Sequence, residues 1–330
     1  MEFRRNIEDK LKAWSQSPFR KPLVLRGARQ VGKTTAVKQF AVNYEQFIYL
    51  NLETDDAKSF EGERDIHKIV DRIFFLKDGE KGKADTLIFI DEIQEVPSAL
   101  NMLRYFYEEY PEYHVIAAGS LLESLFDRDV SFPVGRVDYL YMYPFTFGEF
   151  LEALGERNAL NAYRQVPVPD YAVDKLMQLF HTYTLVGGMP EAVYRYVVTK
   201  DLSQVKPVYD SLLLSYLDDV EKYAKTTNQM QVMRHCIRSC FAEAGERIKF
   251  AGFGESAYSS KEVGEAMRTL RKALILHLTY PTTQTMLPFT PDIKRSPRLQ
   301  VLDTGMLNYF SNIQKEVFTS KDLNNLYKGR

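Results

Sequence analysis

The chain lacks the features of a membrane protein, a disulfide framework and a strongly charged binding protein. Its 330 residues include only two cysteines and have a formal net charge of −1. No apolar run approaches the roughly 20 residues that a membrane-spanning helix needs. The charged start, MEFRRNIEDKLKAW, has no apolar signal segment. We therefore expect a protein of the reducing cytoplasm with no membrane partner. Because the net charge is close to zero, a nucleic-acid-binding surface would have to be a local cluster of basic residues.

The two cysteines do not form a recognisable metal site. Cys236 and Cys240 lie four residues apart, so a helix would place them on one face while His235 points elsewhere. A structural metal site needs more ligands, and none is evident nearby. We expect both cysteines to be small apolar residues of a core.

The length and the hydropathy pattern indicate several domains. The chain is longer than one hydrophobic core usually serves, and its composition, 45% hydrophobic and 26% charged, is that of a globular protein. There are no internal repeats or low-complexity segments. We expect a first domain at 1–146, a helical domain at 147–224, a winged-helix-like domain at 225–310 and a C-terminal segment at 311–330.

Apolar strand-like segments alternate with helical patterns in the first domain. The strand-like segments are Pro22 to Arg26, Gln46 to Glu53, Thr86 to Glu92 and His114 to Ser120. This alternation predicts an α/β fold with a doubly wound parallel sheet covered on both faces. Ligands of such sheets bind beyond the carboxyl ends of the strands, where several polar residues of this chain fall.

Helical spacing dominates after about residue 147. A GGMPEAV segment separates two helical stretches, and from about residue 226 two further helices precede two strand-like pieces, LILHLTYP and RLQVLD. In the second of those helices, Ser259 and Glu262 have the spacing of a capping box. Helices followed by a two-stranded ribbon predict a winged-helix-like arrangement.

The stretch LRGARQVGKTT fits the phosphate-binding pattern G-x-x-x-x-G-K-[ST]. Gly27 and Gly32 let the backbone curl so that N–H groups point inward. Lys33 adds a positive charge for the β and γ phosphates, and Thr34 offers a hydroxyl to Mg²⁺. The alternative, a glycine turn with a solvated lysine, fits less well because the stretch follows a strand and opens a helix. The predicted nucleotide-binding residues are Gly27, Ala28, Arg29, Gln30, Val31, Gly32, Lys33, Thr34 and Thr35.

The segment LIFIDE would supply the second half of such a site. Asp91 ends an apolar strand and offers a hard oxygen to Mg²⁺. Glu92 could orient or deprotonate an attacking water. The alternative is a strand that ends in solvated acids, which the preceding apolar run from Leu87 to Ile90 disfavours.

Four further polar residues have two interpretations each. Ser120 could contact the γ-phosphate or the attacking water, or it could cap a helix. Arg136 could reach a phosphate in its own subunit or in a neighbour's, or it could be a structural arginine. Arg26 and Arg29 flank the loop and could serve the phosphates or the acids Asp91 and Glu92.

These residues give the chain a resemblance to the prokaryotic AAA-like P-loop ATPases of uncharacterised role. The resemblance spans almost the whole sequence, through RKPLVLRGARQVGKTT, IFIDEIQ, AAGS, PVGRVDYLYMYPFTFGEF, LVGGMPEAV, SYLDDVEKY and LQVLDTGMLNY. GGMPEAV and LDTGML are more specific to this family than the P-loop. The resemblance implies ATP and Mg²⁺ as ligands, with Lys33, Thr34, Asp91 and Glu92 as the Walker residues and Ser120 as the polar residue at a strand end.

The sequence departs from this family at its carboxyl end. Members usually continue past a DTGLL segment into a restriction-endonuclease-like domain, whereas this chain stops at Arg330, about twenty residues after its own version. We assign no nuclease residues on this basis.

Three functions remain open at this level: an ATPase that switches its attached domains, a nucleotide-gated DNA-binding protein, and an interaction protein with structural ATP. Glu92 favours the first, since structural ATP needs no water-directing carboxylate. ATP over GTP rests on the resemblance, together with the lack of an N-K-x-D motif. A homo-oligomer or a partner protein also stays open.

Local charge gives one pointer to DNA. Residues 225–300 contain 12 Lys and Arg against 6 Asp and Glu, a difference of +6. A helix from Ser260 to Leu276 would place basic residues in a major groove, or simply on a solvated face. These residues are Lys261, Arg268, Arg271 and Lys272.

Overall fold

The computed structural model describes residues 3–60, 62–63, 65–119, 135–224 and 226–310. The chain divides into two compact units. The first unit is Arg4–Tyr143, and the second combines Phe3 with the chain from Pro144 onward.

The first unit is built on a five-stranded sheet in the order β2-β3-β4-β1-β5, in which neighbouring strands run parallel. Strands β1 and β3 are buried at every position, which explains their nearly continuous apolar sequences. The sheet confirms the predicted α/β fold of the P-loop class. The strands are β1 (Leu23–Arg26), β2 (Gln46–Asn51), β3 (Thr86–Asp91), β4 (His114–Gly119) and β5 (Asp138–Tyr141).

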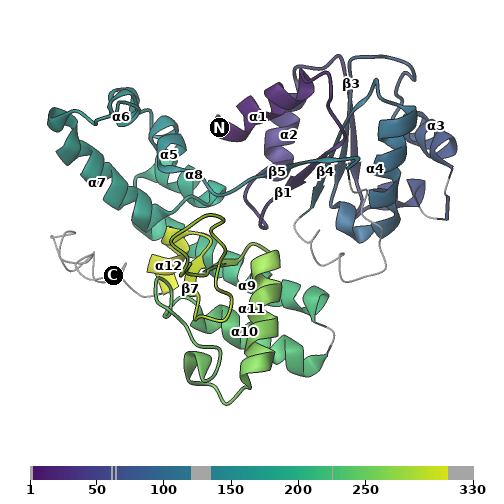
Figure 1. The fold of residues 1–330 in the computed structure, drawn as a ribbon. Coiled ribbons are helices and arrows are strands. Elements are labelled where there is room, and N and C mark those ends of the chain that lie inside the picture. Colours follow the sequence, from purple (N-terminus) through teal and green to yellow (C-terminus); the bar gives the residue numbers. More distant parts are fainter. Residues whose placement is uncertain (1–2, 61, 64, 120–134, 225, 311–330) are drawn as a thin grey trace. The chain divides into compact units, whose positions relative to one another are not determined.

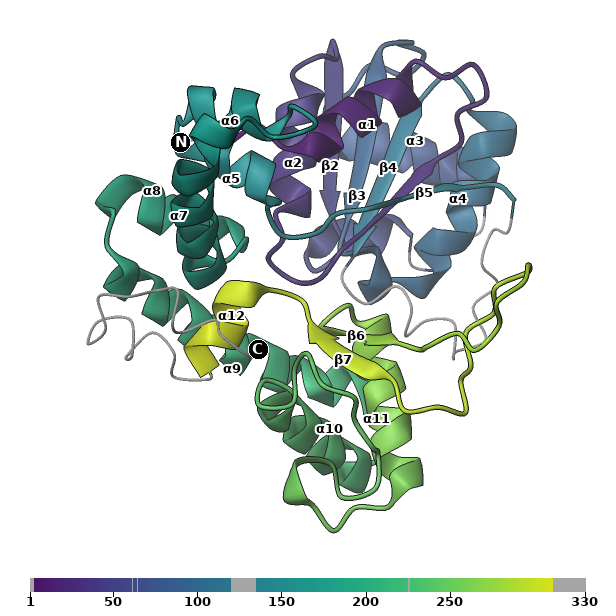
Figure 2. The same ribbon diagram turned by 60° about the vertical axis from the view of Figure 1, so that its left-hand side comes forward.

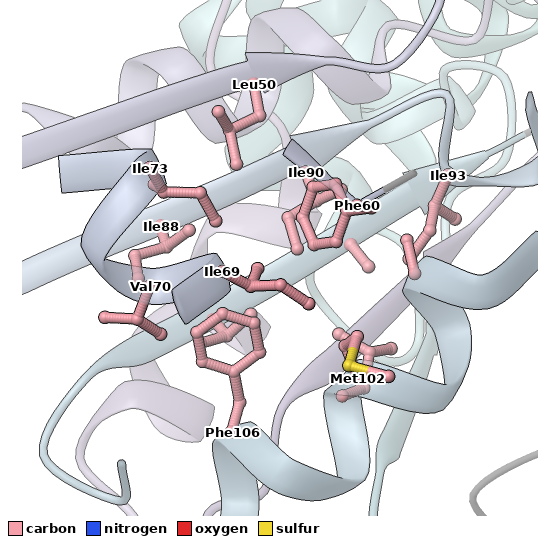
Figure 3. Close-up of a cluster of buried hydrophobic side chains, with 14 of the residues drawn as sticks. Leu50, Phe60, Ile69, Val70, Ile73, Ile88, Ile90, Ile93, Met102 and Phe106 are labelled. Atoms are coloured by element: carbon pink, nitrogen blue, oxygen red, sulfur yellow. The ribbon is translucent and has the colours of Figure 1, made fainter. Parts of the chain in front are cut away.

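Helices cover both faces of this sheet. Figure 1 shows α1 and α2 on one side, and α3 and α4 on the other. On the second side, Ile69 and Ile73 of α3 and Phe106 of α4 pack with Ile88 and Ile90 of β3 (Figure 3). Burial of such side chains stabilises the fold by about 1.5–3 kcal/mol each, so the sheet forms a firm base for the loops at its edges. The helices are α1 (Asn6–Ser15), α2 (Lys33–Ala41), α3 (Ile66–Leu76) and α4 (Pro97–Glu109).

The second unit is mostly helical. Thr146 caps α5 and Ser259 caps α11, each in a reciprocal capping box with the glutamate three residues later. The box at Ser259 and Glu262 was predicted from the sequence. The helices are α5 (Phe147–Ala153), α6 (Arg157–Tyr163), α7 (Asp170–Val186), α8 (Pro190–Thr199), α9 (Lys206–Tyr223), α10 (Thr227–Ser239), α11 (Ser260–Lys272) and α12 (Thr304–Phe310).

The strand-like pieces of this unit form an antiparallel pair, β6 (Leu276–Thr279) and β7 (Arg298–Val301), beside α11 (Figure 2). The predicted helix from Ser260 to Leu276 was four residues too long. Helix α11 ends at Lys272 because Leu274 adopts a left-handed φ of 59°, which turns the chain into β6.

Both cysteines lie in the core around α10. Cys236 and Cys240 have 0% exposure, and burial raises the pKa of the Cys236 thiol to about 12. Across the described ranges, His, Cys, Asp and Glu side chains form no cluster of three or more suited to a metal ion. None of the described helices has both the length and the apolarity that a membrane crossing requires.

The GGMP and LDTGM segments meet inside the second unit around the carboxylate of Asp303. The Gly188 N–H donates to Asp303 Oδ2 at 2.6 Å, and the Tyr209 hydroxyl and the Met306 N–H donate to Oδ1 at 2.8 and 2.9 Å. A Cβ at Gly305 would collide with the Tyr209 hydroxyl and the Val186 carbonyl. We call these contacts the Asp303 tie, since they join α12 to α9 and to the turn before α8.

Candidate functional site

The loop from Gly27 to Gly32 connects β1 to α2 at the carboxyl edge of the sheet. Gly32 is the N-cap of α2 with a left-handed φ of 95°, which favours glycine. At Gly27 a Cβ would lie 2.5 Å from the Met142 carbonyl oxygen, so only glycine fits there. Ala28 and Val31 are buried at 1% and 0% exposure and anchor the loop. The loop therefore presents backbone N–H groups and a helix N-terminus, which suits an anion.

Lys33 is the first residue of α2, and its side chain extends back into this loop. It is 7% exposed, and its Nζ donates to the carbonyls of Gly27 at 2.9 Å and Ala28 at 3.1 Å. Burial lowers the pKa of Lys33 to about 8, and the nearby Glu92 and Asp91 oppose that shift, while Arg29 adds to it. The ammonium is thus positioned at the helix N-terminus, where it adds positive charge to the loop.

Thr34 and Asp91, the two predicted magnesium ligands, are brought together. The Thr34 hydroxyl donates to Asp91 Oδ2 at 2.7 Å, and Asp91 is 3% exposed at the end of β3. One hydroxyl and one carboxylate are the donors that Mg²⁺ takes beside phosphate oxygens and water. These residues fit a magnesium ion.

Tyr49 was missed by the sequence analysis. Its hydroxyl donates to Asp91 Oδ2 at 3.3 Å, and burial together with Asp91 raises the pKa of Tyr49 to about 12. The available signal was strand register, because Asn51 lies beside Asp91 and Tyr49 shares its face of β2.

Glu92 follows Asp91 at a left-handed φ of 52°, a strained conformation for a residue with a side chain. Its carboxylate Oε2 accepts from the Gln94 side-chain amide at 2.5 Å. Burial raises the pKa of Glu92, and the Gln94 amide opposes that rise. Gln94 is a second residue that the sequence analysis missed, and it lies only two positions beyond the predicted acid.

The other predicted residues fall elsewhere. Ser120 lies outside the described residues, directly after β4, so its role stays a prediction. Arg136 precedes β5 and pairs with Glu108 of α4 at 3.0 Å. Since β5 starts beside Leu23, Arg136 lies at the edge where the parallel strands begin, opposite the P-loop. The structure does not bring Arg136 to the P-loop of its own chain.

The arginines that flank the loop differ in environment. Arg26 is 8% exposed, with its guanidinium 4.4 Å from the centre of the Tyr139 ring and its Nη1 donating to the Tyr141 hydroxyl at 3.2 Å. It therefore packs against β5. Arg29 is partly exposed and close enough to Lys33 to lower that residue's pKa.

The basic helix of the second unit is α11. Lys261, Arg268 and Arg271 are exposed and Lys272 is partly buried, while Glu265 interrupts the basic series. The apolar face of α11, including Val263, Met267 and Leu270, is fully buried. The basic side chains therefore lie on the solvent side of the helix.

Two family models match the chain. Residues 19–151 match an AAA domain, and residues 177–317 match a domain of unknown function, DUF8612. No curated protein matches the chain in a sequence comparison.

Solved structures are similar at low identity. A Walker-type ATPase of Pyrococcus abyssi has 15% identity and a TM-score of 0.59, over 94% of this chain and 96% of its own. PCH-2 of C. elegans has a TM-score of 0.39 at 15% identity, over 62% of this chain and 69% of its own. The Aeropyrum pernix ORC1 protein, solved in complex with DNA, has a TM-score of 0.29 at 13% identity, over 96% of this chain and 93% of its own. The first similarity supports the P-loop ATPase fold, and the other two are too low to support an argument.

Proposed function

We propose that this chain, a prokaryotic AAA-like P-loop ATPase whose AAA domain spans residues 19–151, binds ATP with Mg²⁺, hydrolyses it and uses the nucleotide state to switch its attached domains. The observation that carries the proposal is the hydrogen bond of 2.7 Å between Thr34 and Asp91, with Glu92 adjacent. It brings a hydroxyl, a carboxylate and a candidate base together at one edge of the sheet.

Each residue has a distinct task in this mechanism. The loop N–H groups and Lys33 bind the β and γ phosphates and stabilise the charge that develops between them. Thr34 and Asp91 are the residues that would hold Mg²⁺, which would supply positive charge to the phosphate oxygens. Glu92 orients the attacking water and accepts its proton. Its partly buried carboxylate keeps a raised pKa, which makes it a stronger base than a solvated glutamate.

The P-loop is bonded directly to the segment through which the chain leaves the first unit. Arg5 is 5% exposed and donates through Nη1 to the Val31 carbonyl at 3.1 Å and through Nη2 to the Tyr143 carbonyl at 2.8 Å. The Met142 N–H donates to the Arg26 carbonyl at 2.7 Å, and the Met142 carbonyl lies against Gly27. A shift of the loop on nucleotide binding would act on Met142 and Tyr143 without an intermediate element.

The same segment is held where it enters the second unit. The Phe145 N–H donates to the Gly188 carbonyl at 2.7 Å, and the Tyr183 hydroxyl donates to the Phe145 carbonyl at 2.6 Å. These contacts support the proposal that nucleotide state is passed to a helical domain at 147–224 and a winged-helix-like domain at 225–310. The element order α10-α11-β6-β7 supports the second of these assignments. A location in the cytoplasm belongs to the same proposal.

The replacement Glu92→Gln tests the proposal. It preserves size while it removes the base, so we expect ATP binding close to wild type and phosphate release slower by about 10²–10⁴-fold. Calorimetry measures binding and a phosphate assay measures turnover. The matched control is Glu95→Gln, an exposed position three residues on that should keep wild-type turnover. Wild-type phosphate release by Glu92→Gln would refute the role of Glu92.

A nucleotide-gated DNA-binding protein is the second candidate, favoured by the exposed basic residues of α11. Duplex DNA binding should weaken with salt at a slope of about −0.9 per phosphate contact. The double replacement of Arg268 and Arg271 by alanine should flatten that slope by up to roughly 2. Fluorescence anisotropy with and without ATP measures this, and no binding by the wild type would leave α11 as a protein-contact or packing element.

A homo-oligomer remains part of the proposal through Arg136, which lies away from its own P-loop and could serve a neighbouring copy. Turnover per chain that rises with protein concentration, and does so less in Arg136→Ala, would support this arrangement.

A further inference from the structure

We propose that Gln94 is a positioning residue for Glu92, and that its side-chain amide holds the carboxylate in the orientation needed to activate the attacking water. The inference rests on the proposed hydrolysis. It adds to the ATPase residues a group that makes no contact with phosphate or metal and acts through Glu92.

The geometry is a short contact between neighbouring side chains. Gln94 lies in the 3₁₀ turn Ile93–Glu95 that directly follows β3 and Glu92. Its Nε2 donates to Glu92 Oε2 at 2.5 Å. Ile93 is 0% exposed and Gln94 is 8% exposed, so the turn that carries the amide is anchored in the core.

Burial of the Gln94 amide at this position costs free energy of folding. Gln94 Oε1 is buried and has no hydrogen-bond partner among the described residues. A buried acceptor without a partner destabilises the folded state. Methionine or leucine would fill a similar volume without that cost. What glutamine offers here, and those residues do not, is the donor that reaches Glu92.

The backbone of Glu92 is already fixed. Its N–H donates to Asp91 Oδ1 at 3.1 Å, and its carbonyl accepts from the Glu95 N–H at 3.0 Å. The freedom that remains is in the side-chain torsions of Glu92, and ordering them costs entropy. The amide of Gln94 removes that freedom before the water arrives, whereas the nearby charges of Lys33 and Asp91 do not fix a direction.

The first test is Gln94→Met, which keeps the length of the side chain and removes the donor. We expect the Kd for ATP and KM to stay at wild-type values while kcat falls about 10- to 100-fold, as for a misplaced catalytic group. The second variant, Gln94→Leu, has a similar volume, also lacks the donor, and should lose turnover in the same way. Glu95→Gln is the control and should keep the wild-type kcat.

A double-mutant cycle separates positioning from a structural role. In a chain that already carries Glu92→Gln, adding Gln94→Met should cause no further loss of kcat, because the group that Gln94 positions is gone. A further loss equal to that of the single variant would overturn the inference, as would a kcat that rises in Gln94→Met. Turnover by the wild type with unchanged turnover in both Gln94 variants would overturn the inference alone. A wild type no faster than Lys33→Ala would overturn the proposed function with it.

Discussion

Each unit buries a charged side chain beside a glycine-containing motif. The two side chains differ in where their hydrogen-bond partners lie in the sequence. Lys33 in the first unit donates to the carbonyls of Gly27 and Ala28, which belong to its own loop. Asp303 in the second unit accepts from Gly188, Tyr209 and Met306, which come from separate parts of the sequence. The first charge is held locally next to other charges, and the second joins distant elements.

This difference shows what each motif does. The partners of Lys33 lie within one turn of chain, so releasing them breaks no contact between elements, and the ammonium is available to a ligand. Releasing Asp303 would remove the acceptor of the Gly188 and Met306 N–H groups and one of the two acceptors of the Tyr209 hydroxyl, and would weaken the packing of α12 on α9. The P-loop is therefore a binding feature, whereas GGMP and LDTGM, the more specific pieces of the sequence, build the fold of the second unit.

The largest expected effect comes from Lys33→Ala, which should abolish measurable ATP binding without destabilising the first unit. Trp14 is the only tryptophan and is buried in that unit, so its fluorescence follows the unfolding of that unit alone. At an ATP concentration 100 times Kd the wild type should gain about 2.7 kcal/mol of stability, and the variant should gain none. Lys38→Ala, an exposed lysine of the same helix, is the control. Calorimetry that shows wild-type affinity in Lys33→Ala would disprove the site.

The next effect is that of Asp303→Ala on the second unit. The Gly188 and Met306 N–H groups lose their acceptor, and the Tyr209 hydroxyl keeps only the Val186 carbonyl, so we expect a loss of about 2 kcal/mol or more in the free energy of unfolding. Circular dichroism, which follows the helices of both units, should show an earlier transition, while the Trp14 transition and the Kd for ATP stay unchanged. An unchanged dichroism transition would show that Asp303 does not stabilise the second unit. A loss of ATP binding would show that its role is not confined to that unit.

The sequence predicted the first unit better than the second, for a physical reason. Phosphate binding needs glycine, lysine and threonine at fixed short spacings, so Gly27 to Thr34 could be interpreted directly. Tyr49 and Gln94 were missed because their roles depend on strand register and on a side-chain rotamer, which no spacing encodes. The Asp303 tie joins residues 115 positions apart, and only the folded chain brings Gly188 and Asp303 together.

The smallest expected effect is the dependence of stability on pH, which has opposite signs in the two units. Burial lowers the pKa of His114, at the start of β4, from its ordinary 6.5 to about 4. Between these values the unfolded chain binds more protons, so the first unit should lose stability as the pH falls from 6.5 to 4. Burial raises the pKa of Asp303, so its contribution is fully present below the ordinary value of 3.8 and is lost as the pH rises through the raised pKa.

Unfolding monitored by Trp14 fluorescence at several pH values tests this. The dependence between pH 4 and 6.5 should be flatter in His114→Gln, which keeps an acceptor for the Tyr44 hydroxyl. It should be unchanged in His277→Gln, because His277 is an exposed residue of β6 in the second unit, whose unfolding Trp14 does not follow. Equal slopes in the wild type and His114→Gln would show that another group governs acid stability.

The segment around Pro144 has a mechanical consequence. Only Pro144 separates Tyr143, whose carbonyl is bound by Arg5, from Phe145, whose N–H is bound to Gly188. Because proline fixes φ and has no N–H, the chain has one soft torsion fewer here than an ordinary residue would give it. The hydrogen bonds of the first unit therefore end at Tyr143 and those of the second begin at Phe145, with no linker of several residues between them.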